Sequence, residues 1–196
     1  MNIKQIIVGS LSTNCYLIYS GNECIVIDPG DEPEKILAEI KKTKAKVKYI
    51  ILTHYHFDHV LAAQELKNKT GATILIHEKD KDFLDFSADR YLKENEEIKI
   101  GQKALKVIHS PGHTKGSICL LGDNEIFVGD LIFEEGYGRT DLEGGSGEEM
   151  SESLRKISKI LKSGMTIYPG HGNIFQYKKI PILSKAQTDE IGRAMP

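Results

Sequence analysis

The sequence predicts an α+β fold in which two β-sheets pack against each other and helices cover the outside. Short apolar runs of strand length alternate with turn residues over most of the 196 residues, and several longer segments have apolar residues on one helical face. These elements occur in two similar halves, each with strands first and a helix afterwards, which favours a layered sheet-on-sheet core. We expect a single domain over residues 1–196.

The first half begins with strands and continues with helices. Apolar runs at residues 3–8, 14–19 and 24–27 predict three strands, and Pro33 begins a one-sided apolar pattern that ends in lysines near Lys44, as helices do. The later elements of this half are expected to be a buried strand over 50–52, a continuous helix from about Asp58 to Asn68, a strand over 73–76, and a short surface helix and loop over 78–90.

The second half is richer in strands. Turn residues separate four apolar runs, which predict strands over 98–100, 105–108, 117–121 and 125–128. The glycine-rich segment 144–147 is expected to be a flexible loop. Residues 151–161 carry apolar side chains on one helical face and predict a helix, and a short strand over 165–168 follows.

Charge and hydropathy argue against several classes of protein. The chain has 26 Lys and Arg against 28 Asp and Glu, so it offers no basic face for nucleic acid. No window approaches the about 20 apolar residues of a membrane span, and we expect a soluble, cytoplasmic protein with no membrane partner. Cys15, Cys24 and Cys119 lie in apolar runs without Cys-x-x-Cys spacing, which predicts buried free thiols. The oligomeric state stays open.

The segment with the strongest chemical signal is His54-x-His56-x-Asp58-His59, which follows the strand expected at 50–52. In extended chain, residues two apart point the same way, so His54 and His56 face one side, while Asp58 and His59 lie at the start of the next helix. Imidazoles and a carboxylate grouped this closely are typical of a metal site.

Three further side chains suited to metal binding follow strand ends, each directly after a glycine: His113, Asp130 and His171. A glycine beside such a residue lets the backbone turn sharply and approach the site closely. Counting donors, we expect His54, His56 and His113 to hold one ion and Asp58, His59 and His171 to hold a second, with Asp130 bridging them.

Nitrogen and carboxylate donors suit zinc, with iron or manganese as alternatives. Two such divalent ions would turn a bridging water into a hydroxide and polarise a carbonyl or phosphoryl oxygen. The residues therefore predict metal-assisted hydrolysis, in which Asp58 holds and orients the hydroxide.

The motif at 54–59, together with His113, Asp130, His171 and Asp28, resembles the metallo-β-lactamase-fold hydrolases over nearly the whole chain. The resemblance implies an αββα sandwich with the metals at one edge of the two sheets. It also implies that Asp28 supports a ligand through a hydrogen bond and does not bind metal.

Within this family the chain is most similar to the glyoxalase II branch of hydroxyacyl-thiol thioester hydrolases, in a short form. Asp130 in the bridging position and the stretch from Tyr137 through Arg139 to Asp141 carry this similarity. It implies a small-molecule thioester as substrate, contacted by Tyr137 and Arg139. The alternative that Arg139 pairs with a neighbouring carboxylate such as Asp141 stays open. Only the tail 173–196 follows the last histidine, so no separate C-terminal thiol-binding helical domain is expected.

The same ligands leave other activities open. The main alternative is a persulfide dioxygenase with a single iron held by His54, His113 and Asp130, and weaker alternatives are a lactonase and a non-enzymatic metal-binding protein. True β-lactamases of this fold generally lack an aspartate at the bridging position, so Asp130 argues against antibiotic hydrolysis. His77 and His109, which lie outside the motifs, are expected to be structural.

Overall fold

The computed structural model describes residues 1–178 and contains two six-stranded sheets that face each other. The first sheet contains, in order, β1 (Asn2–Val8), β2 (Thr13–Ser20), β3 (Glu23–Ile27), β4 (Lys46–Ile51), β5 (Thr73–His77) and β6 (Arg90–Leu92). The second contains β12 (Phe175–Gln176), β11 (Thr166–Pro169), β10 (Glu125–Gly129), β9 (Ile118–Leu121), β8 (Lys103–His109) and β7 (Glu97–Ile100).

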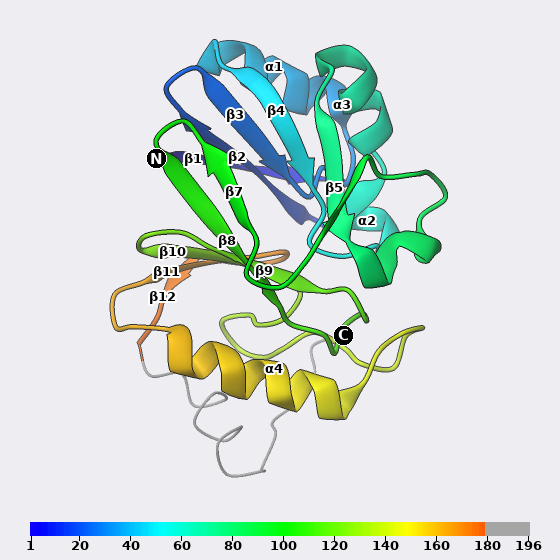
Figure 1. Cartoon of the computed structure of the whole chain (residues 1–196), viewed down its shortest axis with the longest axis vertical. Coiled ribbons are helices and arrows are strands. Elements are labelled where there is room, and N and C mark those ends of the chain that lie inside the picture. The colour runs from blue at the N-terminus through cyan, green and yellow to red at the C-terminus, as the bar shows by residue number, and fades with distance from the viewer. Residues whose placement is uncertain (179–196) are drawn as a thin grey trace.

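Helices cover the outer face of each sheet (Figure 1). The first sheet carries α1 (Pro33–Thr43) and α3 (Ala63–Thr70), and the second carries α4 (Gly147–Ile160). A short helix, α2 (Phe57–Val60), and a 3-10 helix, η1 (Glu78–Phe83), lie beside the first sheet. The predicted αββα sandwich is therefore confirmed for the described residues. Residues 179–196 lie outside the described part, so the absence of a C-terminal helical domain stays a prediction.

The inner strands, such as β2, are buried on both faces because each sheet is covered on both sides. In β2, Tyr16 and Ile18 belong to the apolar layer between the sheets, whereas Cys15 and Leu17 belong to the layer under α1 and α3. Fully burying side chains of this size stabilises the fold by about 1.5–3 kcal/mol each. The middle layer draws residues from both sheets and holds them together as one domain.

Strand direction brings the carboxyl ends of several strands to one edge of the sandwich. In the first sheet β3, β4 and β5 are parallel. In the second sheet β10 is parallel to β11, and β8 and β10 are both antiparallel to β9, so these three run the same way. Segments that follow these strands therefore meet at that edge, where ligands commonly bind.

The continuous helix expected from Asp58 to Asn68 is instead two helices, α2 and α3. The amide of Ala62 donates to the carbonyl of Pro29 at 3.0 Å and not to the carbonyl of Asp58 one turn earlier. Gly30 lies so close to that carbonyl that a β-carbon at position 30 would be 1.6 Å from it. The loop after β3 thus interrupts the helix and fixes its first turn against the segment that contains Asp28.

The helix α4 begins at Gly147, inside the segment expected to be a flexible loop. The side chain of Ser146 accepts a hydrogen bond from the amide of Glu149 at 3.3 Å, which is the Ser-x-x-Glu capping arrangement of a helix start. The glycines on either side of Ser146 concealed this cap. The strands β6 and β12, of three and two residues, were not expected because such short segments show no periodicity.

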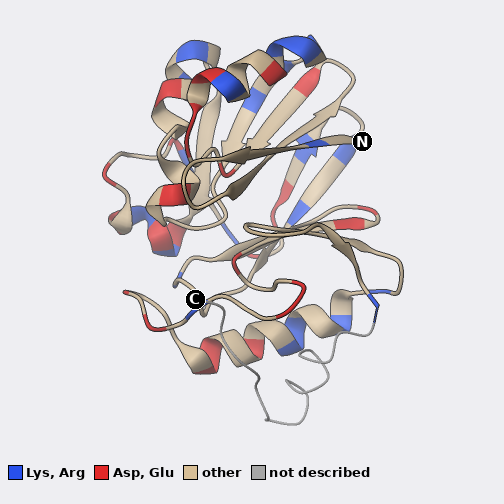
Figure 2. Ribbon diagram, turned by 180° about the vertical axis from the view of Figure 1, so that it is seen from behind, with Lys and Arg blue, Asp and Glu red and all other residues tan. Residues whose placement is uncertain are grey.

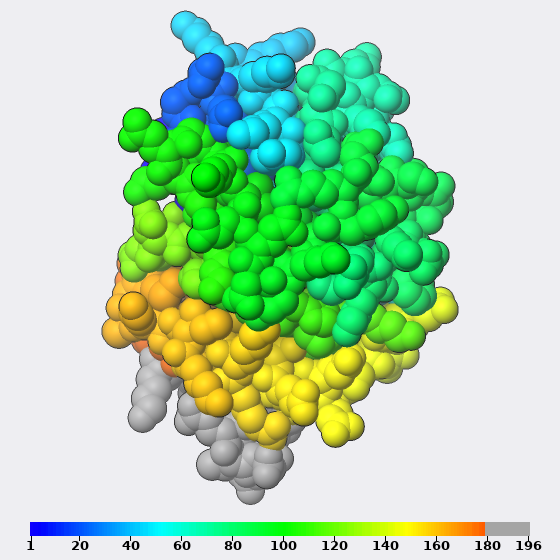
Figure 3. Space-filling model, in the orientation of Figure 1, coloured from blue at the N-terminus to red at the C-terminus, as the bar shows by residue number. Residues whose placement is uncertain are grey.

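Charged residues of both signs occur along α1 and α4, as the colours of Figure 2 show. The space-filling view shows the segment of β7 and β8 across the middle of one face, between α1 and α4 (Figure 3). Cys15, Cys24 and Cys119 are free and buried, as predicted. Within residues 1–178 the helices are too short or too polar to span a membrane.

Candidate metal centre

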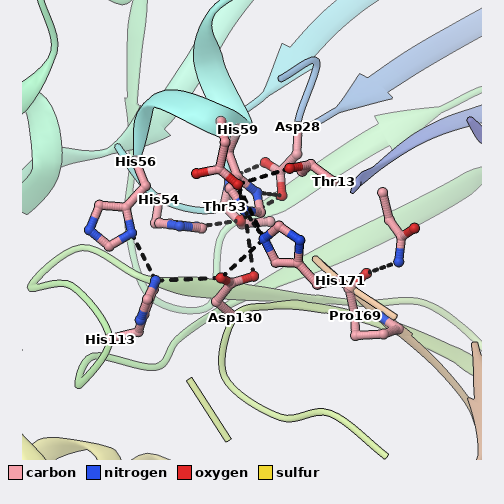
Figure 4. A network of polar contacts seen from close by, with 12 residues as sticks. Thr13, Asp28, Thr53, His54, His56, His59, His113, Asp130, Pro169 and His171 are labelled. Carbon is pink, nitrogen blue, oxygen red and sulfur yellow. Dashed lines mark hydrogen bonds and ion pairs between the residues drawn. The ribbon is translucent and has the colours of Figure 1, made fainter. Parts of the chain in front are cut away.

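All seven predicted metal ligands meet at the edge where the strand ends converge. Figure 4 labels each of them except Asp58. Donor atoms lie within 4.8 Å of one another in three groups, which are His54, His56 and His113; Asp58, His59 and His171; and His54, His59 and Asp130. The first two groups are the two ligand sets predicted from donor counting. Asp130 lies between them, with its carboxylate oxygens 3.5 Å from the Nε2 atoms of His59, His113 and His171.

The outer ring nitrogens of two histidines are fixed by backbone carbonyls. Nδ1 of His113 donates to the carbonyl of Arg139 at 2.7 Å, and Nδ1 of His171 donates to the carbonyl of Leu11 at 3.1 Å. A carbonyl can only accept, so the proton of each neutral ring is on Nδ1 and the lone pair is on Nε2, which for His113 lies 2.8 Å from Nδ1 of His56. Metal-binding histidines are typically held in this way.

Asp28 fixes the protons of two further histidines. It is 1% exposed, and Oδ2 accepts from the hydroxyl of Thr53 at 2.7 Å and from Nδ1 of His59 at 3.0 Å. Because the hydroxyl of Thr53 gives its proton to Asp28, its oxygen accepts from Nδ1 of His54 at 3.0 Å. In the neutral rings, this carboxylate therefore leaves the lone pair on Nε2 of a histidine of each ligand set, directly for His59 and through Thr53 for His54.

Unpartnered buried atoms show that the site fits metal ions. Within the described residues, Nε2 of His54, Nε2 of His56 and Oδ1 of Asp130 are buried without a hydrogen-bond partner. A buried polar atom left in this way costs about 1–3 kcal/mol. A divalent cation would satisfy Nε2 of His54 and Oδ1 of Asp130, and the donors suffice for two such ions.

The metal-free site is strongly polarised. Burial lowers the pKa of His54 well below its ordinary value, so this ring is neutral. Burial also acts to lower the pKa of His59, but Asp130 and Asp28 outweigh it and raise that pKa to about 9. A metal ion must therefore displace a proton from His59 at neutral pH.

Asp58 remains ionised in this surrounding. Burial acts to raise its pKa, but the hydrogen bond from Nε2 of the protonated ring of His171 and the charge of His59 hold that pKa well below its ordinary value. Thr13 adds a hydrogen bond from its hydroxyl to Oδ2 of Asp58 at 2.8 Å. The carboxylate is thus anchored on one side and faces Nε2 of His171 at 3.2 Å on the other.

Gly170 permits a close approach of the backbone to the side chains of the centre. A β-carbon at this position would lie 2.1 Å from Oδ1 of Asp130 and 2.7 Å from Cε1 of His59. Any other residue would push one of these two side chains away. The glycine before His171 is therefore required by packing, as the strand-end pattern predicts.

A cavity of about 670 Å³ opens beside the donors. The described residues that line it are Leu11, His56, Phe57, Asp58, His113, Asp130, Phe133, Glu134, Glu135, Gly138, Arg139, Leu142, His171, Gly172 and Asn173.

The two predicted substrate residues differ in their placement. Arg139 lines the cavity, but its guanidinium forms two hydrogen bonds with the carboxylate of Asp141, at 2.8 and 2.7 Å. This is the neighbouring pair that the sequence leaves open as an alternative. Tyr137 does not line the described cavity and packs against the apolar cluster between the second sheet and α4. Its predicted contact with substrate therefore has no support from its position.

Several residues at the site were not predicted. Thr13 and Thr53 hold ligands through hydroxyl groups, and no pattern marks Thr13 because it is distant in sequence from Asp58. Asp80 is buried, and its carboxylate accepts from the hydroxyl of Thr114 at 2.7 Å and from the amide of Gly116 at 2.6 Å. Burial raises the pKa of Asp80 to about 6. Through these two hydrogen bonds, Asp80 joins η1 to the loop that contains His113.

His77 and His109 lie apart from the donor groups described above. Their rings stack with centroids 4.1 Å apart and an interplanar angle of 4°. Nε2 of His109 donates to the carbonyl of Lys115 at 2.9 Å, and Nδ1 of His77 accepts from the amide of Lys79 at 3.3 Å. The contacts of both rings are those of structural residues.

Comparison with known proteins agrees with this fold and site. The model of the metallo-beta-lactamase superfamily matches residues 8–171, and the chain belongs to that superfamily. It is a metallo-hydrolase of this class, with relatives that include the hydroxyacylglutathione hydrolase GloC of Haemophilus influenzae. That protein is 34% identical over 194 residues, which cover 88% of this chain and 92% of the relative.

Two solved structures are similar in fold. The BLEG-1 B3 metallo-beta-lactamase superposes with a TM-score of 0.84 and 27% identity, over 89% of this chain and 94% of the other. TTHA1623, solved in a di-iron-bound form, superposes with a TM-score of 0.77 and 30% identity, over 88% of this chain and 94% of the other.

Proposed function

We propose that this protein hydrolyses a thioester, in particular an S-2-hydroxyacyl-thiol, with divalent metal ions bound at the donor groups described above. The observation that carries the proposal is the similarity to a hydroxyacylglutathione hydrolase over most of both chains. The complete set of seven donors supports it, because a relative that had lost the chemistry would have no need to keep them. Zinc is the first candidate metal, and iron or manganese are the alternatives.

Bound divalent ions would supply an activated water at neutral pH and polarise the substrate carbonyl. The chain supplies the geometry for this chemistry. Asp58, ionised and anchored by Thr13, is placed to accept a hydrogen bond from the attacking water and to orient it. A thiol of the cysteine type has an ordinary pKa of about 8.5, far below that of an alcohol, so a leaving thiol needs no strong general acid.

The proposal is tested with purified protein whose metal content has been measured. Hydrolysis of S-lactoyl thioesters is followed beside oxygen uptake with a thiol persulfide. Thioester hydrolysis that falls by orders of magnitude in Asp58→Ala and His113→Ala would support the proposal. Oxygen uptake with one iron per chain and no hydrolysis would replace it with the persulfide dioxygenase alternative.

Turnover of a β-lactam in preference to any thioester would also overturn the proposal. It would place the chain with the B3 metallo-beta-lactamase that it resembles in fold. Metal content, circular dichroism and thermal unfolding of each variant show whether a loss of activity reflects the site or the fold.

A further inference from the structure

Exposed apolar side chains gather around the cavity beside the metal centre. Within residues 1–178, six large apolar side chains are exposed, namely Ile7, Leu11, Phe57, Leu61, Tyr91 and Leu142. Half of them, Leu11, Phe57 and Leu142, line this cavity, although they come from separate segments of the chain. Phe133, which is half-buried, adds a fourth apolar side chain. Apolar groups collected around a concave site mark a surface that an apolar ligand covers.

The charges around the same cavity are predominantly negative. Glu134 and Glu135 are exposed and line it, and Asn173 donates a hydrogen bond to the carboxylate of Glu134 at 3.1 Å. Arg139 is the one lysine or arginine among the described lining residues, and its guanidinium is paired with the carboxylate of Asp141. An anionic group on a ligand would therefore face carboxylates without a free cation to pair with.

The acyl part of a 2-hydroxyacyl thioester is small and polar, and its carbonyl must lie at the metal donors to react. The apolar side chains must then contact the other part of the molecule, which is the thiol. Resting on the proposed thioester hydrolysis, we infer that the thiol of the natural substrate is apolar and carries no negative charge. The cavity selects against glutathione, whose carboxylates have no free cation to meet among the described residues.

A matched pair of substrates tests this inference. The S-lactoyl esters of butanethiol and of 3-mercaptopropionate have similar length and differ in the charge at the far end of the thiol. We expect kcat/KM to be about tenfold higher for the butanethiol ester, the order that one well-placed apolar or repelled group contributes in a binding pocket. S-lactoylglutathione should be hydrolysed less efficiently than the butanethiol ester.

Variants of the lining residues test whether the preference for the butanethiol ester arises from the cavity. Leu142→Ala should lower kcat/KM for the butanethiol ester, mainly by raising KM. The ratio of kcat/KM between the butanethiol ester and the mercaptopropionate ester should therefore fall. The double change Glu134→Gln with Glu135→Gln should raise kcat/KM for the mercaptopropionate ester alone. Leu61→Ala is the control for Leu142→Ala, because Leu61 is also an exposed leucine, at 58% against 40%, and does not line the cavity. It should leave both substrates unchanged.

Failure of the inference and failure of the proposed function give different results. Equal kcat/KM for the two esters, or preference for S-lactoylglutathione, overturns the inference and leaves thioester hydrolysis standing. If metal-loaded protein hydrolyses no thioester, the proposed function is overturned, and calorimetric binding of the corresponding non-hydrolysable thioethers decides the cavity preference. Tighter binding of the butyl thioether that weakens in Leu142→Ala supports it, and equal binding of the two thioethers overturns it.

Discussion

Replacing Thr53 by valine should weaken metal binding while the fold is kept. Valine has nearly the same shape as threonine but has no hydroxyl group. The change removes the acceptor of the Nδ1 proton of His54, at 3.0 Å, and a donor to Asp28, at 2.7 Å. Without this acceptor the proton of the neutral ring is free to move to Nε2, the atom that a metal ion needs.

The size of the effect follows from burial. Thr53, His54 and Asp28 are each 1% exposed, so water cannot replace the lost partner. An unsatisfied buried donor costs about 1–3 kcal/mol, and the free energy of unfolding of the metal-free protein should fall by that amount. Loss of a hydrogen bond behind a ligand typically weakens metal binding about 10–100-fold.

Two measurements check this prediction. Competition with a chromophoric chelator gives the metal affinity, and urea unfolding of chelator-treated protein gives the stability. Thr53→Ser keeps the hydroxyl and is the control, expected to bind metal close to the unchanged protein. The reasoning would be refuted if Thr53→Val bound metal within about twofold of the unchanged protein, or if Thr53→Ser were equally impaired.

Three further predictions concern pH and packing. In metal-free protein the pKa of His59 is raised from 6.5 to about 9, so its protonated ring stabilises the fold below pH 6.5, and this contribution of about 3 kcal/mol is lost as pH rises through 9. Urea unfolding with chelator at pH 6 and pH 9.5 should show the fall, and His59→Gln should show less of it. The pKa of Asp80 is raised from 3.8 to about 6, so the contribution of its protonated form is present below pH 3.8 and lost by about pH 6. The free energy of unfolding of Asp80→Asn should therefore rise relative to that of the unchanged protein by about 2 kcal/mol between pH 4 and pH 7, and a constant difference would contradict the assignment. Gly170→Ala should lower metal affinity at least about tenfold, because its β-carbon would lie 2.1 Å from Oδ1 of Asp130. Gly147→Ala, where the nearest atom is 3.8 Å away, is the control, and equal affinities in the two variants would show that the close approach is tolerated.

The parts of the site that sequence could predict are those fixed by short-range chemistry. His54 and His56 are two residues apart at the end of a strand, and each of the more distant ligands follows a strand and a glycine. The turn, the strand end and the donor type are all local properties, so their recurrence was visible without a structure. When strands are parallel, their carboxyl ends lie at the same edge of the sheet. This usual arrangement is enough to bring the predicted ligands together.

The parts that sequence could not predict depend on contacts between distant segments. Gly30 approaches the carbonyl of Asp58 and ends α2, although nothing near residue 62 indicates a helix break. Thr13 reaches Asp58 across 45 residues of sequence. The partner of Arg139 could not be predicted either, because the geometry of the loop decides whether its guanidinium contacts Asp141 or a substrate. The cap at Ser146, by contrast, is local and could have been recognised by its Ser-x-x-Glu spacing.

The side chains that carry the chemistry and those that line the cavity are held in different ways. The donors follow strands whose backbone is held by sheet hydrogen bonds, and their outer nitrogens are fixed by Asp28 and by backbone carbonyls. Leu11, Glu134 and Leu142 lie outside helices and strands and belong to none of the donor groups. Exchanging these side chains should therefore change which thiol is accepted and leave metal affinity unaltered. A lower metal affinity in Leu142→Ala would show instead that the side chains of the cavity also hold the metal ligands in position.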